Sequence, residues 1–572
     1  MGRKKYTQPV LTRWGEAFDP KAPLQEYPRP QLWRKSYRLL NGVWEFTVQE
    51  EGASRPRCYD DAIVAPFPPE SPLSCVKRRP RRGERLWYRR VLEFPHDFLQ
   101  DKLFCHFGAV DQACTVYLNG YRVGTHKGGY LPFTMDLTPF LHSKKENILE
   151  VEAWDDTERG DTAYGQQSRK GEALRYPAYS GIWQTVWLES VPMTYVKGLR
   201  ITPLYDDAAV RIELTGGPIP EAHVDVLAQG TRVAAGTFDE AGVCRIAMEE
   251  FESWTPERPF LYDLRVYAGR DVVESYFAMR KISAVEDEKG RMRFALNNRP
   301  YFCAGVLDDG YWPDGLSAPP SDQAIRADLE DVKAMGFNMV RKHQKVESMR
   351  WYYHCDRLGL LVFQDMPRGG RPARSERKKP VAGRCDKPSA YFGRRDAGAR
   401  KRFEEELSEL AARLYNTPSV AAYTIFGEGR GQFDALRLTE TLWIEDPTRL
   451  IDHAAGWCDQ GGGDFKSVCA LKNGARVRPD RRVLFVSSFG GVGFGPGRAA
   501  GGRPCRSEAE FSARLKTVYQ KMYEAAQAGA SGCVYARLAD LPGGCDGLLT
   551  ADRRTHKTAP EELAGLNRGL RR

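Results

Sequence analysis

Residues 336–363, GFNMVRKHQKVESMRWYYHCDRLGLLVF, contain the pattern from which the fold of half of this chain can be inferred. A short apolar run, 337–340, is followed by an amphipathic stretch, 348–358, and then by a second apolar run, 360–363. Short buried strands that alternate with helices are typical of parallel sheets, in which each helix returns the chain to the same edge. The stretch therefore predicts one strand–helix–strand unit.

The same alternation continues on both sides of this unit. Apolar runs are separated by helical stretches, for example 324–335, 402–414 and 511–528. The runs are 301–306, 337–340, 360–363, 420–425, 450–452, 467–469, 483–486 and 532–535. Eight such units predict a C-terminal (β/α)8 TIM barrel over 286–572, whose chemistry would lie just after the strands, at the C-terminal rim.

The chain before residue 286 has a different pattern, because apolar and polar residues alternate over short segments. In 1–195 this alternation, for example in 43–48 and 114–118, predicts a jelly-roll β-sandwich. Residues 196–285 contain several shorter segments of the same kind, which predict an immunoglobulin-like β-sandwich. We therefore expect a multidomain chain with boundaries at about residues 195 and 285.

The composition limits the partners and the compartment. The 572 residues include 85 basic and 75 acidic side chains, a formal net charge of +10, which permits an anionic partner without requiring one. No apolar run approaches the about 20 residues that span a bilayer, and no apolar segment follows the basic N-terminus, so we expect neither membrane association nor a signal peptide. The 13 scattered cysteines form no zinc pattern, which predicts reduced thiols, a cytoplasmic protein and no metal site.

Polar residues follow the predicted strands at the expected rim. Glu428 stands between glycines after the fourth run, which suits a general acid/base but is also common in a solvated loop. The second run ends at Arg341 and His343 and the third at Asp365, which are either ligand-binding or structural partners of one another. Trp312, after the first run, either presents a ring face to a sugar or packs below the rim.

The domain order and several strings resemble glycoside hydrolase family 2, the group of β-galactosidases, β-glucuronidases and β-mannosidases. Strings similar to the sugar-binding domain of that family are LNGVW (40–44), LWYRR (86–90), VYLNG (116–120) and SGIWQ (180–184). Those similar to its second strand–helix unit are GFNMVRKH (336–343) and WYYHCD (351–356). The resemblance covers nearly the whole chain. It implies a carbohydrate ligand and the hydrolysis of terminal β-glycosides with retention of configuration, without a cofactor.

The resemblance also implies two catalytic glutamates, one after strand 4 and one after strand 7. The acid/base falls on Glu428, but the nucleophile falls on Ser488, within SSFGG (487–491). A retaining mechanism needs two carboxylates about 5–5.5 Å apart. A serine hydroxyl needs an adjacent base before it can attack, and it does not stabilise an oxocarbenium-like transition state as a carboxylate does. Efficient retaining hydrolysis is therefore not expected.

Further departures from the family fall at positions that would surround the sugar. Gly427 replaces the asparagine that precedes the acid/base, and Arg430 replaces a tryptophan that commonly follows it. Arg537 stands where relatives carry glutamine after strand 8, and strand 6 reads SVCAL (467–471) instead of SVHNY. The substitutions gather at the sugar subsite while the scaffold still matches, which indicates a relaxed or altered demand on that subsite.

Basic residues are dense in 368–402, which follows the third strand. One interpretation is a cationic barrel mouth, completed by Arg430 and Arg537, that takes a uronic acid, a sulfated glycan or a phosphate. The other is a solvated loop. Nucleic-acid binding is not expected, because aromatic residues in register with these charges are lacking.

Three hypotheses remain open: a glycosidase with the family activity in carbohydrate metabolism, a catalytically silent carbohydrate-binding pseudoenzyme, and an altered hydrolase that acts by inversion or on an acidic glycan. Inversion requires a general base about 6.5–9.5 Å from the acid, and the candidates are Asp365, Asp459 and Asp464. The sequence leaves open the sugar, the linkage and whether the chain forms a homo-oligomer.

Overall fold

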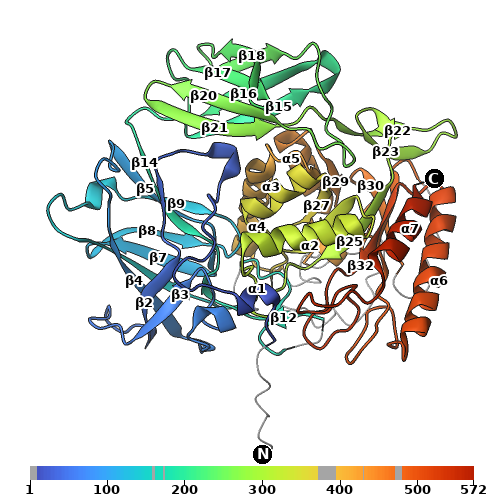
Figure 1. Ribbon diagram of the computed structural model, residues 1–572, viewed down its shortest axis with the longest axis horizontal. Coiled ribbons are helices and arrows are strands. Elements are labelled where there is room, and N and C mark those ends of the chain that lie inside the picture. Colours follow the sequence, from blue (N-terminus) through green and yellow to red (C-terminus); the bar gives the residue numbers. More distant parts are fainter. Residues whose placement is uncertain are drawn as a thin grey trace, which may run out of the picture.

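The computed structural model describes residues 10–157, 162–171, 174–370, 394–429, 431–470 and 480–571. A jelly-roll sandwich, an immunoglobulin-like sandwich and a parallel barrel follow one another along the chain, which confirms the predicted fold class. In Figure 1 the jelly-roll domain lies at the left, the barrel lies at the right, and the immunoglobulin-like domain lies above both.

The jelly-roll domain consists of two antiparallel sheets that enclose an apolar core. One sheet has the order β3-β2-β4-β10-β7-β8 and the other the order β1-β14-β5-β9. The strands are β1 (Tyr37–Leu39), β2 (Gly42–Glu50), β3 (Asp61–Ala65), β4 (Glu84–Leu92), β5 (Lys102–Phe107), β7 (Ala113–Leu118), β8 (Tyr121–Lys127), β9 (Phe133–Asp136), β10 (Asn147–Trp154) and β14 (Val186–Val191). In β2, Trp44 and Phe46 are buried while Val43 and Glu45 are exposed, as period-2 alternation requires.

The immunoglobulin-like domain packs a three-stranded sheet, β15-β16-β19, on a four-stranded sheet, β18-β17-β20-β21. Its strands are β15 (Gly198–Leu204), β16 (Ala209–Thr215), β17 (His223–Ala228), β18 (Thr231–Thr237), β19 (Val243–Ala247), β20 (Tyr262–Ala268) and β21 (Asp271–Phe277). β14 and β15 lie on either side of the domain boundary that we expected near residue 195.

A small sheet that the sequence analysis did not predict joins this domain to the barrel. It is formed by β22 (Ile282–Glu286), β23 (Met292–Leu296) and β24 (Arg299–Pro300). Its buried Phe294 lies 6.0 Å, between ring centroids, from Phe363 of the barrel. Ile282 and Leu296 belong to the same apolar cluster, together with Phe465 and Phe485 of the barrel strands. The hairpin therefore covers the end of the barrel at which the strands begin.

The barrel has eight parallel strands in the order β29-β28-β27-β26-β25-β32-β31-β30. They are β25 (Cys303–Asp308), β26 (Met339–Lys342), β27 (Leu361–Asp365), β28 (Val420–Thr424), β29 (Leu450–Asp452), β30 (Phe465–Ala470), β31 (Val483–Gly490) and β32 (Gly532–Ala536). Each overlaps one of the eight predicted runs. The amide of Asp464, before β30, donates to the carbonyl of Ile451 in β29 at 2.8 Å, which connects the two ends of the sheet.

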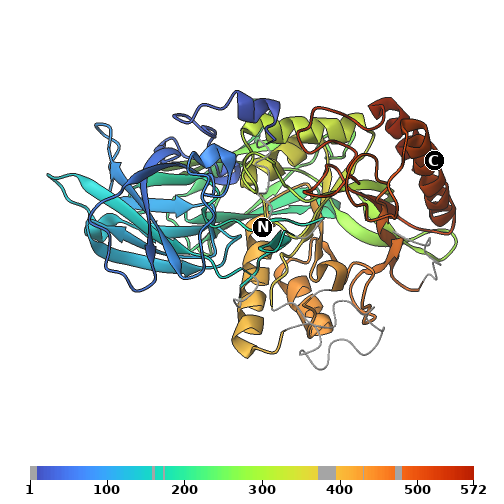
Figure 2. The same ribbon diagram turned by 90° about the horizontal axis from the view of Figure 1, so that it is seen from below.

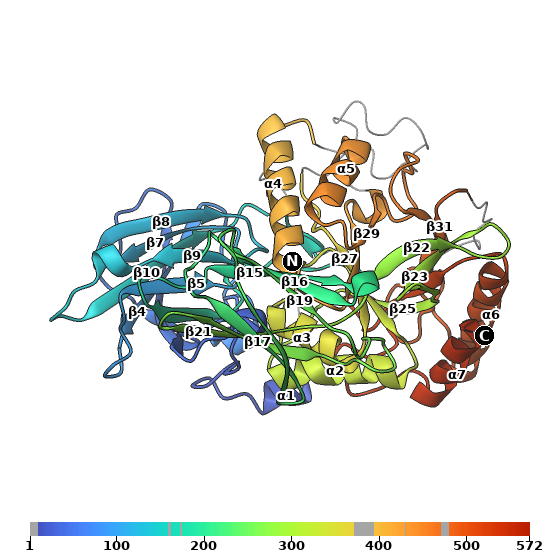
Figure 3. The ribbon, with the colours of Figure 1, turned by 90° about the horizontal axis from the view of Figure 1, so that it is seen from above.

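Helices surround these strands on most sides. They are α2 (Asp322–Ala334), α3 (Met349–Leu358), α4 (Ala397–Leu414), α5 (Ala435–Glu445), α6 (Glu508–Gln527) and α7 (Pro560–Leu570); a short α1 (Arg13–Glu16) precedes the first domain. Figures 2 and 3, seen from opposite sides, place α4 and α5 on one flank of the barrel and α6 and α7 on another. The jelly-roll domain occupies a third flank.

Among the described residues, no helix lies between β29 and β30. The connecting segment, 453–464, contains Gly456, Gly461, Gly462 and Gly463, three of which have a positive φ. Each glycine in a helix interior costs about 1 kcal/mol relative to alanine, so this segment forms turns instead. This connection therefore departs from the usual barrel pattern, in which a helix follows every strand.

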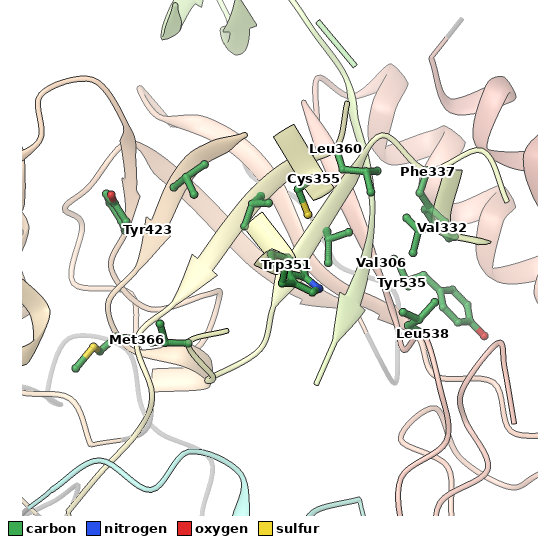
Figure 4. Close-up of a cluster of buried hydrophobic side chains, with 14 of the residues drawn as sticks. Val306, Val332, Phe337, Trp351, Cys355, Leu360, Met366, Tyr423, Tyr535 and Leu538 are labelled. Atoms are coloured by element: carbon green, nitrogen blue, oxygen red, sulfur yellow. The ribbon is translucent and has the colours of Figure 1, made fainter. Parts of the chain in front are cut away.

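The barrel core lies between the strands and the helices (Figure 4). Val306, Tyr423 and Tyr535 on the strands belong to the same buried cluster as Val332 of α2 and Cys355 of α3. Because these side chains fill the outer layer, the polar residues at the strand ends remain available for the mouth of the barrel.

Candidate functional site at the barrel mouth

Glu428 lies four residues after the end of β28, in the single turn Gly427–Gly429. Its backbone has φ 58° and ψ 24°, the left-handed region that non-glycine residues rarely adopt and that is common at functional sites. Its side chain is 30% exposed, and its Oε1 lies 3.8 Å from Nε2 of His343. The fold thus places a partly exposed carboxyl beside an imidazole at the mouth of the barrel.

His343 belongs to a row of charged groups across the strand ends. Its Nδ1 lies 2.7 Å from Oδ1 of Asp309, and Oδ2 of Asp309 accepts a hydrogen bond from Nη1 of Arg537 at 2.6 Å. Nε of Arg537 lies 3.4 Å from Oδ1 of Asp546. Burial alone would raise the pKa of Asp309, but Arg537 and His343 hold that pKa below its usual range. Asp309 is therefore ionised, and each of its two carboxylate oxygens already contacts a partner, His343 or Arg537.

Arg341 and Asp365 form a second buried pair. Nε and Nη2 of Arg341 donate to the two carboxylate oxygens of Asp365, both at 2.9 Å, while Nη1 donates to the carbonyl of Ser487 at 2.9 Å. Burial disfavours the guanidinium, yet the carboxylates, Asp365 first, raise the pKa of Arg341 above its usual value. Both side chains are almost fully buried, so this bidentate pair orients the rim.

Ser488 lies on β31 in register with Cys469 of β30 and is 9% exposed. Adjacent strand residues face opposite sides, and Phe489 packs against Tyr519 of α6, so Ser488 faces the interior of the barrel. The hydroxyl of neighbouring Ser487 donates to the carbonyl of Ala455 at 2.7 Å. Position 488 thus carries a hydroxyl in place of a carboxylate.

Asp452, at the end of β29, is also engaged. It accepts a hydrogen bond from the hydroxyl of Ser467 and further bonds from the amides of Ala454 and Ala455, at 3.2 and 2.9 Å. Like Asp309 and Asp365, it is a rim carboxylate that already has protein donors.

The structure does not bring the other two candidate bases to the mouth. Asp459 accepts two hydrogen bonds from Arg482, both at 2.9 Å, and Arg482 directly precedes β31. Asp464 directly precedes β30 and accepts from the amide of Ile451 at 2.7 Å and from the indole of Trp443 at 3.0 Å. Asp464 and Arg482 therefore stand where strands begin, whereas Glu428 follows the end of a strand.

Other side chains already fill the space, next to Glu428, that a side chain at position 427 would occupy. A Cβ added to Gly427 would lie 2.8 Å from Nε2 of Gln344 and 3.0 Å from Oδ2 of Asp365. Gln344 is fully buried and donates to the carbonyl of Gly427 at 3.3 Å. The sequence analysis missed Gln344, although it belongs to the same polar run as Arg341 and His343.

Trp312 packs below the rim. Its ring is 4% exposed, with the guanidinium of Arg553 4.5 Å from its centroid. Trp14, from the segment before the jelly-roll domain, meets it edge-on at 6.2 Å. The ring therefore offers no open face to a sugar, and of the two interpretations from sequence the packing role describes its position.

A segment of the jelly-roll domain forms one wall of the mouth. It carries β11 (Gln167–Ser168) and β12 (Tyr176–Pro177), which pair in parallel. Nε2 of Gln166 lies 3.4 Å from Nε2 of His343, and Tyr176 stacks on Tyr311 with 6.0 Å between ring centroids. The amide of Tyr164 donates to the carbonyl of Arg368 at 2.8 Å. No local sequence pattern predicted that this segment of the jelly-roll domain contacts the barrel.

Part of the expected cationic mouth, namely 371–393 and Arg430, lies outside the described residues, as does Leu471 of the string SVCAL. At the described end of the basic stretch, Arg395 and Lys401 are exposed, whereas Arg394 is packed. Arg394 is 1% exposed, lies 4.6 Å from the ring centroid of Phe403, and has a pKa that burial lowers to about 10. Arg537, the other proposed member, is paired with Asp309 and Asp546.

Two further expectations concern metals and membranes. Among the described residues, no group of three or more His, Cys, Asp and Glu side chains is arranged to hold a metal ion. Within the same ranges, no helix is long and apolar enough to cross a membrane.

Comparisons with known proteins agree with this architecture. Residues 59–192 match the family model described as glycosyl hydrolases family 2, sugar binding domain. A β-galactosidase from Thermoanaerobacter pseudethanolicus is 27% identical over 298 residues, which cover 49% of this chain and 39% of that protein. A β-glucuronidase from Streptococcus agalactiae is 23% identical over 427 residues, or 70% of this chain and 68% of that protein. The chain thus spans about two fifths of the first relative.

Solved structures show the same fold over nearly the whole chain. A β-D-glucuronidase from Dictyoglomus thermophilum has a TM-score of 0.74 at 20% identity, covering 94% of this chain and 98% of that one. A β-glucuronidase from Ruminococcus gnavus in complex with D-glucuronic acid has a TM-score of 0.70 at 18% identity, with 96% and 99% coverage. The chain therefore has the three-domain fold of these solved β-glucuronidases. Together with the match of residues 59–192, this likeness makes the chain a glycoside hydrolase family 2-like protein, similar to β-galactosidases and β-glucuronidases.

Proposed function

We propose that this chain binds a terminal β-linked sugar at the barrel mouth and does not hydrolyse it efficiently. The observation that carries the proposal is the state of the carboxylates. Glu428 occupies the acid/base position, but Ser488 stands where the nucleophile would be, and Asp309, Asp365 and Asp452 already accept hydrogen bonds from protein groups. Among the described residues, no carboxylate stands at the nucleophile position that a retaining mechanism requires.

The ligand class follows from the relatives and from the wall of the mouth. Related proteins are β-galactosidases and β-glucuronidases, and one solved neighbour holds D-glucuronic acid. Gln166, His343 and Gln344 gather near Glu428 and offer donors and acceptors that suit sugar hydroxyls. Arg341 and Arg537 are neutralised by aspartates, so the described charges favour a neutral sugar over an acidic one.

The test compares wild type with Ser488→Glu, with the uncharged control Ser488→Gln, and with Glu428→Gln. Aryl β-galactosides, β-glucuronides and β-mannosides are the substrates, and calorimetric titration with the free sugars measures binding. We expect binding but no turnover above buffer for wild type and Ser488→Gln, and turnover for Ser488→Glu. Each 1.36 kcal/mol of transition-state stabilisation restored by the carboxylate corresponds to a tenfold gain in rate.

Added azide gives an independent measure of whether Glu428 remains a competent acid. In wild type, azide can occupy the space left by the carboxylate and attack the anomeric carbon, while Glu428 protonates the departing aryl oxygen. We expect a glycosyl azide of inverted configuration, and none in Glu428→Gln. Wild-type turnover in buffer that Glu428→Gln abolishes would overturn the proposed silence, and failure of every sugar to bind would overturn the binding role.

A second candidate is an inverting hydrolase with Asp365 as the base. It is favoured by the closeness of Asp365 to the acid/base strand, since Oδ2 lies 3.0 Å from the place of a Cβ on Gly427. Against it, both oxygens of Asp365 accept hydrogen bonds from Arg341. This candidate requires wild-type turnover that Asp365→Asn abolishes, and a first-formed product of inverted anomeric configuration by NMR.

A further inference from the structure

A hollow of about 190 Å³ lies between the C-terminal ends of two barrel strands and helix α6. Ala470 at the end of β30 and Phe489 and Gly490 at the end of β31 form one side, and residues of α6 form the other. A site of about 10–15 Å³ already holds a single water molecule, so this one has room for a polyatomic group. Its charged lining residues are Arg503, Arg514 and Lys521, and its lining contains no aspartate or glutamate.

These three cations differ from those of the barrel mouth. Arg341, Arg537 and Lys342 each hold a carboxylate at 3.0 Å or less. By contrast, no carboxylate in the described part of the chain lies within 4.0 Å of Arg503, Arg514 or Lys521. The hollow therefore gathers positive charge that the described part of the chain does not neutralise.

The helix fixes two of the cations on one face. Arg514 and Lys521 are seven residues apart on α6, with Thr517 and Val518 between them at the same hollow, so the side chains stand one above another. Nη1 of Arg514 donates to the carbonyl of Arg503 and lies 3.5 Å from Sγ of Cys505, which orients the guanidinium. Arg514 is only partly exposed, whereas Arg503 and Lys521 are open to solvent at the edge.

The chemistry that matches this arrangement is a small oxyanion. The planar guanidinium fork of arginine pairs with two oxygens of a phosphate or sulfate, and the ammonium of lysine adds a point charge. Phe489, Val492 and Met522 form an apolar floor, which lowers the local dielectric and strengthens the attraction. We propose that this hollow, the β31–α6 site, binds a phosphate or sulfate group, either free or carried on a sugar.

The β31–α6 site is separate from the barrel mouth. Phe489 lines it and packs outward against Tyr519, at 5.4 Å between ring centroids, while the preceding Ser488 faces the interior. Occupancy of one site therefore does not require the residues of the other.

The experiment is calorimetric titration of the full chain with inorganic phosphate, inorganic sulfate, glucose 6-phosphate and glucose. The variants are Arg514→Gln and Lys521→Gln. The matched control is Lys516→Gln, which removes the same charge from an exposed position on the same helix, where Lys516 pairs with Glu562 at 3.1 Å. Thermal melting in the absence of anions checks that each variant is folded.

We expect anion binding to wild type that weakens at least tenfold in Arg514→Gln and in Lys521→Gln, changes less than twofold in Lys516→Gln, and weakens with added salt. Glucose should not bind at this site, and Glu428→Gln should leave anion binding unchanged, which separates this proposal from the proposed function. Tighter binding of glucose 6-phosphate than of phosphate assigns the site to a sugar ester, and equal binding assigns it to the free anion. No anion binding, or equal losses in Arg514→Gln and Lys516→Gln, would overturn the proposal.

Discussion

Gly427 and Gln344 are complementary in size beside Glu428. The absence of a side chain at position 427 leaves room that the buried amide of Gln344 fills, with a hydrogen bond back to the carbonyl of Gly427 at 3.3 Å. A family-type asparagine at 427 therefore does not fit into the present packing. The departure at one position is coupled to the side chain at another, which a residue-by-residue reading of the sequence does not reveal.

We predict that Gly427→Asn alone lowers the free energy of unfolding by about 1–3 kcal/mol, because it overpacks a filled site. Gln344→Ala should relieve that overlap. The double variant should therefore be less destabilised than the sum of the two single variants, with a coupling of about 0.5–3 kcal/mol. Urea denaturation of the four proteins completes the cycle, and strictly additive losses would show that the two positions are not coupled.

At the scale of elements, Arg341 on β26 connects parts of the barrel that are not neighbours in the sheet. It holds Asp365 on the adjacent β27 and reaches the carbonyl of Ser487 on β31, which is separated from β26 by β25 and β32. A long side chain thus crosses the interior near the rim. The guanidinium can remain charged while buried only because it and the carboxylate of Asp365 both have hydrogen-bond partners.

We predict that Arg341→Met destabilises the chain by about 3–5 kcal/mol, because it leaves the carboxylate of Asp365 buried without its cation. The double variant Arg341→Met/Asp365→Leu should lie closer to wild type than Arg341→Met does. Equilibrium unfolding in urea measures both. If the double variant loses as much as the two single changes together, the uncompensated charge is not the cause.

At the scale of the whole molecule, Asp356 links the immunoglobulin-like domain to the barrel. The hydroxyl of Tyr276, in β21, donates to its carboxylate at 2.7 Å, and the amide of Ser419, before β28, donates at 2.8 Å. Its carbonyl accepts from the indole of Trp254 at 2.8 Å. Burial raises the pKa of Asp356 to about 7, in spite of these hydrogen bonds, which favour the charged form.

This raised pKa makes the stability of the folded chain depend on pH. An unfolded aspartate releases its proton near pH 4, about its ordinary pKa, whereas the folded protein keeps it until about pH 7. In that window the folded state binds more protons, so the contribution of Asp356 is fully present below about pH 4 and is lost as the pH rises toward 7, by at most about 1.36 kcal/mol per pH unit. Asp356→Asn should remove this slope.

Chemical denaturation of wild type and Asp356→Asn at several pH values between 4 and 7 checks the prediction. As the pH rises, wild type should lose unfolding free energy relative to Asp356→Asn. The variant should also show a constant loss at every pH, because its hydrogen bonds are altered. A Tyr276→Phe control removes one donor but keeps the titrating carboxyl, and should therefore keep the slope. A difference that stays constant across the window would contradict the raised pKa.

The local pattern of apolar and polar residues was sufficient to predict most of the fold. The eight barrel strands overlap the eight predicted apolar runs, because every strand except the half-buried β30 is buried on both faces. The exceptions have local causes as well. The glycines of 453–464 replace a helix, and the hairpin β22–β24 was hidden because its short strands resemble those of the preceding domain.

What the sequence by itself determined is the order of three domains, the identity of the residues at the strand ends, and the presence of Ser488 and Gly427 at two positions that matter in the family. The roles of Glu428 and Ser488 remain predictions. Only the tertiary structure decided which charges are already paired, that Trp312 is covered by Arg553, and that Gln344 fills the space beside Gly427. The physical reason is the distance along the sequence over which each kind of information acts. Periodicity reports which face of one segment is buried, whereas the hydrogen bond from Arg537 to Asp309 joins residues 228 positions apart.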